Sequence, residues 1–372
     1  MNITAGLYGL SYGLLVGLLV LSNLLIIPSN LQMLLFTFAC IFIGSHQSLR
    51  LSETEVDGTR KNTETLTKKD AMMFPVFGSI ALFSLYVAYK YVGPWLMNLL
   101  LSGYVILLGM AAVAESFTPV VERMLPKSLA VPSIPVKCTI PTDLLNKILE
   151  TKGGVDTKVS WAHLGGWLIA IVTGVGFWST KHFVLHNIFA VSFAIQGIRL
   201  MSVGSFLNGF IMLWGLFIYD VFWVFGTDVM ITVAKNFEGP VKLILPTSFD
   251  PWKQGILGLG DIVIPGVFVA INLRFDDFMA RKKLGLSIHR PDIDILYSFE
   301  KPYFRAVVIA YLIGLLVTGL VMFAFNHGQP ALLYLVPACT GACFVTSFMR
   351  GELKELWAYD ETHNQVEEKK SS

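Results

Sequence analysis

Long apolar segments separated by shorter polar loops follow one another along nearly the whole chain. A helix needs about 20 mostly apolar residues to cross the hydrocarbon core of a bilayer. Nine segments meet this requirement: Leu31–Leu49, Met73–Tyr91, Trp95–Ala114, Trp161–Trp178, Phe183–Met201, Phe206–Phe225, Ile256–Leu273, Phe304–Phe325 and Pro330–Phe348. The pattern predicts an all-α polytopic membrane protein with nine transmembrane helices.

A further apolar segment, Leu7–Ile27, precedes these spans. It carries Gly9, Gly13 and Gly17 at four-residue spacing, which gives a helix a flat face suited to close packing. Three interpretations stay open: an extra span, a re-entrant hairpin ended by Pro28, or a cleaved signal. Because a basic N-terminal region is lacking, cleavage is the least favoured of the three.

The loops predict little folded structure of their own. The longest, Glu115–Ser160, contains five prolines, which stop long helices, so we expect an irregular cover there. Between the sixth and seventh spans, Val229–Ala234 and Val241–Leu245 are apolar and β-branched, which predicts two short strands. No separate soluble domain is expected.

The composition supports a membrane protein and excludes other classes. Hydrophobic residues make up 54% of the chain and charged residues 15%, whereas soluble domains average about 25% charged residues. The net charge is +2 and the basic residues are dispersed among loops, so nucleic acid is not an expected partner. The four cysteines lack CxxC spacing and are interpreted as small core residues, so no metal site is predicted.

The basic residues predict the orientation of the chain, because Lys and Arg accumulate on the cytoplasmic side of membrane proteins. With the C-terminus of a nine-span chain in the cytoplasm, all but five of the 28 basic residues fall on that side. The exceptions are Lys90, Lys181, Lys235, Lys242 and Lys253. We therefore predict a cytoplasmic C-terminus.

Two aspartates lie inside consecutive spans, where ionisable residues mark functional sites by default. Asp220 follows Tyr219 in the sixth span, and Asp261 lies in the seventh; neither has a basic residue nearby in sequence. Consecutive spans usually pack as neighbours, so both carboxyl groups can share one water molecule. Two carboxylates about 4 Å apart repel by roughly 4 kcal/mol, so one keeps its proton and the pair can act as acid and base. A helix-packing role is the alternative interpretation.

Other candidate residues flank these aspartates or open the last span. Gly258 and Gly260 leave room for a substrate backbone beside Asp261, although close helix packing explains them equally well. Pro330 begins the ninth span, where proline is common, and the amide of Gln329 can hydrogen-bond an extended peptide. These residues predict a site for substrate positioning.

Three motifs resemble the signatures of presenilin-type intramembrane aspartyl proteases, and of the signal peptide peptidase branch in particular. They are Tyr219-Asp220 within Phe217–Gly226, Gly258-Leu259-Gly260-Asp261 within Leu257–Gly266, and Gln329-Pro330-Ala331-Leu332 within Gln329–Pro337. Each motif alone is a weak signal, whereas all three on the sixth, seventh and ninth spans are a strong one. The resemblance covers the chain from about Leu31 onward.

The resemblance implies an aspartic endopeptidase that cleaves type II oriented transmembrane segments, including remnant signal peptides, in the endoplasmic reticulum membrane. Asp220 and Asp261 would be catalytic, with water and no other cofactor; Tyr219, Gly258 to Gly260 and Gln329 to Leu332 would bind substrate. The implied partners are transmembrane peptides and the lipid bilayer. A homo-oligomer and endoplasmic reticulum quality-control machinery are compatible with it. The cytoplasmic C-terminus fits this branch better than presenilin.

This interpretation divides the chain into three parts: a leader or extra membrane segment (1–30), a nine-span protease domain (31–349) and a cytoplasmic tail (350–372). The protease domain comprises N-terminal helices (31–201), catalytic helices (206–273) and C-terminal helices (304–349). A substrate helix hides its carbonyl groups, so it must unwind before water can attack. We expect the unwound segment to add as a strand to one of the two predicted strands after the sixth span.

Short motifs near the ends of the chain are weaker signals. Lys369 and Lys370 resemble a dilysine signal for retrieval to the endoplasmic reticulum, and Asn2 begins a glycosylation sequon. The GxSxG pattern that begins at Gly9 lies in an apolar helix, so it is interpreted as coincidence. His182 and His186 stand four residues apart without an HExxH motif, which disfavours a zinc protease.

Two other functional classes remain as alternatives. A polytopic proton-coupled transporter also carries acidic residues near the midplane, but it predicts two related halves, and no internal repeat is visible. A non-catalytic membrane quality-control factor could use the same fold to hold substrates. Substituting the two aspartates by Asn separates these classes from a protease.

Overall fold

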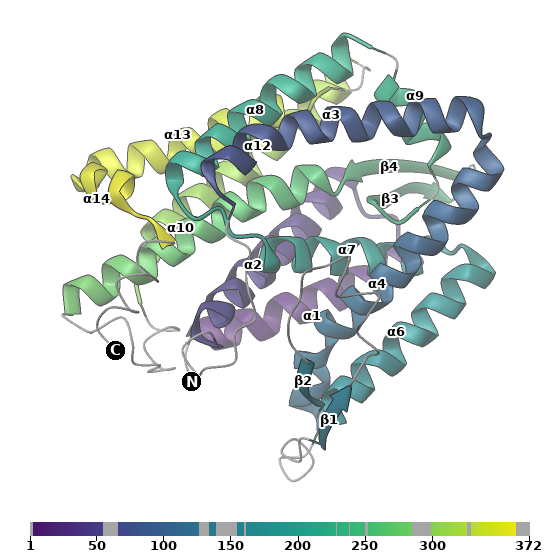
Figure 1. The fold of residues 1–372 in the computed structure, drawn as a ribbon, viewed down its shortest axis with the longest axis horizontal. Coiled ribbons are helices and arrows are strands. Elements are labelled where there is room, and N and C mark those ends of the chain that lie inside the picture. The colour runs from purple at the N-terminus through teal and green to yellow at the C-terminus, as the bar shows by residue number, and fades with distance from the viewer. Residues whose placement is uncertain are drawn as a thin grey trace.

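Helices make up most of the computed structural model, which describes residues 3–54, 66–125, 134–138, 155–159, 161–227, 229–237, 239–249, 252–284, 299–325 and 329–361. The helices are α1 (Ile3–Leu24), α2 (Ser29–Thr54), α3 (Lys68–Tyr91), α4 (Pro94–Met124), α6 (Trp161–Thr180), α7 (Phe183–Leu200), α8 (Phe206–Phe225), α9 (Val229–Asn236), α10 (Gly260–Leu284), α12 (Pro302–Phe325), α13 (Leu332–Arg350) and α14 (Leu353–Ala358) (Figure 1). Two antiparallel hairpins join β1 (Ile134–Cys138) to β2 (Val155–Val159) and β3 (Lys242–Phe249) to β4 (Trp252–Gly258).

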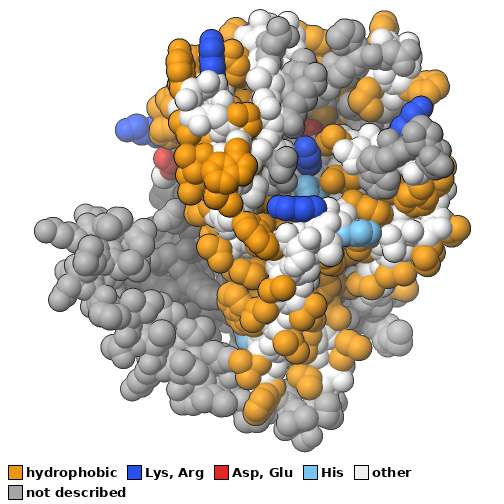
Figure 2. All heavy atoms as spheres, turned by 90° about the vertical axis from the view of Figure 1, so that its right-hand side faces the viewer, with side chains coloured by type: hydrophobic (Ala, Val, Ile, Leu, Met, Phe, Trp, Pro, Cys, Tyr) orange, Lys and Arg blue, Asp and Glu red, His pale blue; other side chains and the backbone are white. Residues whose placement is uncertain are grey.

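The long helices confirm the predicted all-α membrane architecture. In the part of the chain that the structure describes, α2, α3, α4, α6, α7, α8, α12 and α13 are long and apolar enough to cross a membrane. Large apolar side chains on their outer faces are exposed, including Leu168 of α6 and Phe323 of α12. On the face drawn in Figure 2, hydrophobic side chains are spread widely over the described residues. Because water disfavours such a surface, these faces fit the hydrocarbon of a bilayer.

Helix α10 is the central element and corresponds to the predicted seventh span. It contacts α2, α7, α8, α12 and α13, and it runs through the middle of the assembly in Figure 1. Its residues 265–276 are buried on every side. A helix enclosed all round buries more than one stripe, which explains why its sequence shows no amphipathic pattern. Charged residues cluster toward its C-terminal end, with Arg281, Lys282 and Lys283 in the last turn.

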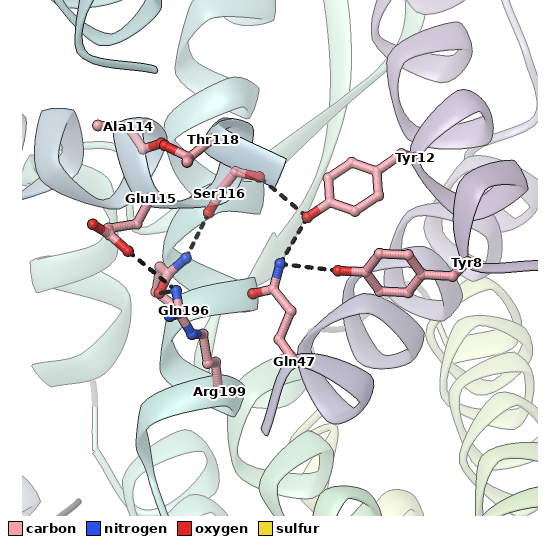
Figure 3. A network of polar contacts seen from close by, with 9 residues as sticks. All are labelled: Tyr8, Tyr12, Gln47, Ala114, Glu115, Ser116, Thr118, Gln196 and Arg199. Carbon is pink, nitrogen blue, oxygen red and sulfur yellow. Dashed lines mark hydrogen bonds and ion pairs between the residues drawn. The ribbon is translucent and has the colours of Figure 1, made fainter. Parts of the chain in front are cut away.

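Helix α1 packs against α2 and α7 as part of the folded body. Tyr8 and Tyr12 are buried, and the Gln47 amide of α2 donates to their hydroxyls at 3.3 Å and 2.7 Å (Figure 3). The Tyr12 hydroxyl donates in turn to the Ser116 carbonyl of α4 at 3.1 Å. Gln196 of α7 donates to the Ser116 hydroxyl at 3.0 Å, so one polar network joins four helices. The apolar part of α1, Tyr8–Leu24, is shorter than the eight candidate spans, so an extra span stays a prediction.

Three local predictions are wrong. Val229–Ala234 belongs to helix α9 and not to a strand. The segment predicted as Ile256–Leu273 begins with the end of strand β4, and its helix runs from Gly260 to Leu284. The loop predicted as irregular at Glu115–Ser160 holds the paired strands β1 and β2, and helix α4 continues into it through Pro119 to Met124. A single proline removes only one intrahelical hydrogen bond, while the rest of α4 stays packed on α6 and α7. By contrast, the strand predicted at Val241–Leu245 is present as β3.

The chain after α13 folds back onto the helical bundle. Asp360 forms an antiparallel bridge with Ser205, at the start of α8, and the Glu361 N–H donates to the Gly204 carbonyl at 2.7 Å. The tail predicted at residues 350–372 therefore packs on the body as far as residue 361. Lys369 and Lys370, like Asn2 at the other end, lie outside the described residues.

Candidate active site

Asp220 lies on the stripe of α8 that faces the protein interior. The buried residues of this helix recur every three or four positions, at Phe206, Gly209, Met212, Leu213, Leu216, Asp220 and Trp223. The opposite stripe, with Ile218, Phe222 and Phe225, is exposed. Helical periodicity thus places a carboxyl group among apolar neighbours, and the side chain is only 5% exposed.

Asp261 lies in the first turn of α10, immediately after a strand. Strand β4 ends at Gly258, and Leu259 joins it to the helix: the Leu259 N–H donates to the Val241 carbonyl at 3.2 Å, which continues the ladder. The Leu259 carbonyl then accepts from the N–H of Val263 at 2.8 Å, which starts the helix. A strand that changes directly into a helix therefore fixes the position of the second aspartate.

Gly258 leaves space against the Asp261 carboxyl group. A Cβ atom built on Gly258 would lie 3.3 Å from Asp261 Oδ2, closer than most Cβ contacts in proteins. A Cβ on Gly260 would meet only the end of Ile264, at 3.8 Å. Of the two predicted glycines, Gly258 thus has a steric reason to lack a side chain, and the reason is the carboxyl group itself.

The start of α13 contacts Asp220 directly. Pro330, Ala331 and Leu332 are buried, and the Leu332 backbone N–H donates to Asp220 Oδ2 at 3.1 Å. The N–H groups of a first helical turn have no partner within their helix, so this one is available to a carboxyl group. Residues 112 positions apart in the chain, which sequence reasoning could only list as separate motifs, form one site.

The two carboxyl groups belong to one electrostatic environment. Helices α8 and α10 are in contact, and Asp220 acts electrostatically on Asp261. Helix α13 packs against both α8 and α10, so all three predicted motifs meet at one place. Two acidic groups held together in a protein interior can share a proton, and one can then serve as acid while the other serves as base.

The remaining predicted residues lie around this centre. Tyr219 packs toward α3, where a Cβ on Gly78 would lie 3.5 Å from its ring, and its ring centroid is 6.4 Å from that of Trp223. Gln329 is partly exposed immediately before the buried Pro330. Tyr219 therefore belongs to the contact between α3 and α8, and Gln329 stands at the entrance to α13.

Helix α7 covers one edge of the β3–β4 hairpin. Asn187 Nδ2 donates to the Ile244 carbonyl at 2.7 Å, and Asn187 Oδ1 accepts from the Ile244 N–H at 2.8 Å. His186 Nε2 donates to the Lys242 carbonyl at 2.9 Å. No sequence pattern pointed to Asn187, because its partner lies 57 residues further along the chain.

The other edge of the hairpin belongs to β4. Backbone groups in an antiparallel ladder alternate between facing the partner strand and facing away. The backbone groups of Ile244 and Lys242 face α7. Their cross-strand partners Ile256 and Gly258 therefore direct their own backbone groups to the outer edge of β4. Within the described ranges, no strand pairs with that edge. The edge ends three residues before Asp261.

The histidines four residues apart have structural contacts. His182 Nδ1 accepts from the Val184 N–H at 3.2 Å and so caps α7, while His186 holds β3 as described above. No group of three or more His, Cys, Asp or Glu residues within the described part of the chain is placed to hold a metal ion.

Fold and site together define a polytopic membrane protein with two aspartates on adjacent helices in its interior. The profile of the family described as signal peptide peptidase matches residues 58–363. The chain is 35% identical over 344 residues to signal peptide peptidase of Homo sapiens, and the match covers 89% of this chain and 83% of that protein. It is 31% identical over 329 residues to a probable intramembrane protease of Schizosaccharomyces pombe, covering 88% and 93%. The chain belongs to the signal peptide peptidase family, which confirms the resemblance carried by the three motifs.

Proposed function

We propose that this chain is an intramembrane aspartyl endopeptidase in which Asp220 and Asp261 act together on one water molecule. The supporting observation is the meeting of the two aspartates with the start of α13 inside the helical bundle, where the Leu332 N–H holds one of the carboxyl groups. Family membership supports proteolysis within the membrane. The aspartic mechanism rests on the site.

The two aspartates divide the chemistry between them. The ionised carboxylate takes a proton from water, whose oxygen bonds to the carbonyl carbon of the scissile peptide. The protonated carboxyl donates a hydrogen bond to the carbonyl oxygen and stabilises the tetrahedral intermediate. The C–N bond then breaks as the leaving amine takes up a proton. The pair exchanges one proton during the cycle, so the roles belong to the pair and not to one residue.

The substrate chain is proposed to add to the outer edge of β4. Helix α9 takes the place of the first strand predicted to accept substrate, and α7 occupies the edge of β3. The backbone groups of Ile256 and Gly258 face outward, so a strand that pairs with them runs directly to Asp261. Residues 329–332 are proposed to flank the same substrate at the start of α13. Backbone pairing accepts many side chains, which suits a protease for transmembrane segments of varied sequence.

We propose type II oriented transmembrane segments, including remnant signal peptides, as substrates, and the endoplasmic reticulum membrane as the location. The basic residues on one side of the spans support a cytoplasmic C-terminus, and Lys369 and Lys370 support retrieval to that membrane. The human relative is named signal peptide peptidase, which supports this substrate class. A homo-oligomer and quality-control partners remain predictions from the family resemblance.

Cleavage of a labelled signal peptide by the purified protein in liposomes tests the proposal. Asp220→Asn and Asp261→Asn should each abolish product while the peptide still binds. Asp70→Asn is the matched control, because Asp70 is an exposed helix-capping residue at the start of α3. A transporter would show aspartate-dependent flux without product, and a holding factor would bind without cleaving even as wild type. Equal product from wild type and Asp261→Asn rules out the enzyme.

A further inference from the structure

Pro265 removes a hydrogen-bond donor from the turn that carries Asp261. In an α-helix the carbonyl of each residue accepts from the N–H four positions later. Helix α10 begins at Gly260, and the residue four positions after Asp261 is Pro265, which has no N–H. The main-chain carbonyl of Asp261 therefore lacks its ordinary intrahelical partner, in a part of α10 that is buried from Pro265 onward.

Tyr311 of α12 supplies the missing donor. Its hydroxyl donates to the Asp261 carbonyl oxygen at 3.1 Å. The side chain is fully buried and lies on the interior stripe of α12, with Val307, Val308 and Leu315. A phenol placed among apolar side chains needs a partner for its hydroxyl, and a carbonyl freed by proline needs a donor. The two groups satisfy each other across the contact between α10 and α12.

Helices α12 and α13 thus hold both aspartates. The Tyr311 hydroxyl of α12 donates to the main-chain carbonyl of Asp261. The Leu332 N–H of α13 donates to the side-chain carboxyl group of Asp220 at 3.1 Å. The two helices pack closely against each other. Because α12 contacts Asp261, α13 contacts Asp220 and the two helices are packed together, their packing helps to fix the spacing of the two carboxyl groups.

We propose that Tyr311 is a positioning residue for Asp261, a role that rests on the proposed function. Its hydroxyl holds the first turn of α10 in the orientation that directs the Asp261 carboxyl toward Asp220. Pro265 is needed for this role, because it leaves the Asp261 carbonyl without a donor from α10. The first turn of α10 therefore depends on α12 for that hydrogen bond. Tyr311 makes no contribution to the chemistry except through this geometry.

A double-mutant cycle tests the pairing of these two residues. Tyr311→Phe removes only the hydroxyl, and we expect kcat to fall roughly 10-fold or more, because small displacements of a catalytic group are costly. KM should change little. Pro265→Ala returns an N–H to the position that serves the Asp261 carbonyl, so Tyr311→Phe in that background should lower kcat less than about 3-fold. This rescue by a backbone donor is not expected of a purely structural tyrosine.

Tyr303→Phe is the matched control. Tyr303 is a buried tyrosine on the same helix, and its hydroxyl donates to Glu352 Oε2 at 2.9 Å, away from the aspartates. It should keep kcat while both tyrosine variants show similar thermal unfolding. If Pro265→Ala does not yield folded protein, the difference in kcat between Tyr311→Phe and Tyr303→Phe decides alone.

Two results would overturn the proposal: unchanged kcat in Tyr311→Phe, or an equal loss with and without Pro265→Ala. The Asp261→Asn variant is measured beside the cycle. If it cleaves like wild type, the proposed function fails; if it is inactive and the cycle is additive, only the positioning role fails.

Discussion

The carboxylate of Glu361 links the segment just before α8 to the middle of α10, away from the two aspartates. It accepts from Arg274 Nε at 2.6 Å, from the Ser202 hydroxyl at 2.5 Å and from the Tyr359 hydroxyl at 3.1 Å. Ser202 precedes α8 and Arg274 belongs to α10, so one side chain links both helices that carry the aspartates. We predict that Glu361→Ala destabilises the protein strongly.

The burial of the ion pair sets the magnitude. The side chains of Arg274 and Glu361 are only 9% and 13% exposed. Removing one partner leaves a shielded charge uncompensated, which costs about 3–5 kcal/mol in the free energy of unfolding. Adding Arg274→Met removes the stranded charge, so the double variant should be more stable than Glu361→Ala alone. The exposed pair between Lys282 and Glu355, 3.6 Å apart, provides the control: Glu355→Ala should cost about 0–1 kcal/mol.

Unfolding in mixed detergent micelles, followed by circular dichroism, measures these free energies. A chain ending at residue 361 should unfold like the full chain, because it retains the carboxylate and its three donors. A cost for Glu361→Ala no larger than that for Glu355→Ala would refute the reasoning. So would a double variant less stable than Glu361→Ala.

Three further predictions concern the outer edge of β4, the surroundings of Asp261 and the first helix. Ile256→Pro removes the outward N–H of residue 256 in β4 and should lower kcat/KM for the peptide roughly 3- to 10-fold, which corresponds to one hydrogen bond. Ile256→Ala keeps that N–H, so a loss as large as that of Ile256→Pro would count against strand addition. Gly258→Ala places a Cβ 3.3 Å from Asp261 Oδ2 and should lower kcat about 10-fold, with thermal unfolding as the check that the fold persists. Helices α1 and α2 are joined by a short link and pack together, so an α1 that crosses the membrane leaves residue 2 on the cytoplasmic side, where it is not glycosylated. Asn2→Gln should then leave the electrophoretic mobility of the protein unchanged. A shift in mobility would show a glycan at Asn2 and place that residue in the lumen.

Features set by short stretches of sequence were predictable. The sixth span, Phe206–Phe225, has the same limits in the sequence pattern and in the structure. Hydropathy determines a span because every residue meets the same slab of hydrocarbon, about 30 Å thick, whatever its neighbours are. The positions of Asp220 and Asp261 followed from the same rule, since an acidic residue inside such a segment is conspicuous without any knowledge of its contacts.

Features that depend on contacts between distant residues were decided by the tertiary structure. The sequence around Ile244 does not indicate that Asn187 hydrogen-bonds to the backbone groups of Ile244. The exposed edge of the hairpin therefore could not be assigned to β4 from the sequence. The apolar, β-branched composition of α9 suits a strand as well as a helix, and its neighbours select the helix. The hydroxyl that completes the turn of Asp261 likewise comes from Tyr311, 50 residues away. Periodicity records which face of an element is buried, whereas only the packed helices determine which partner that face meets.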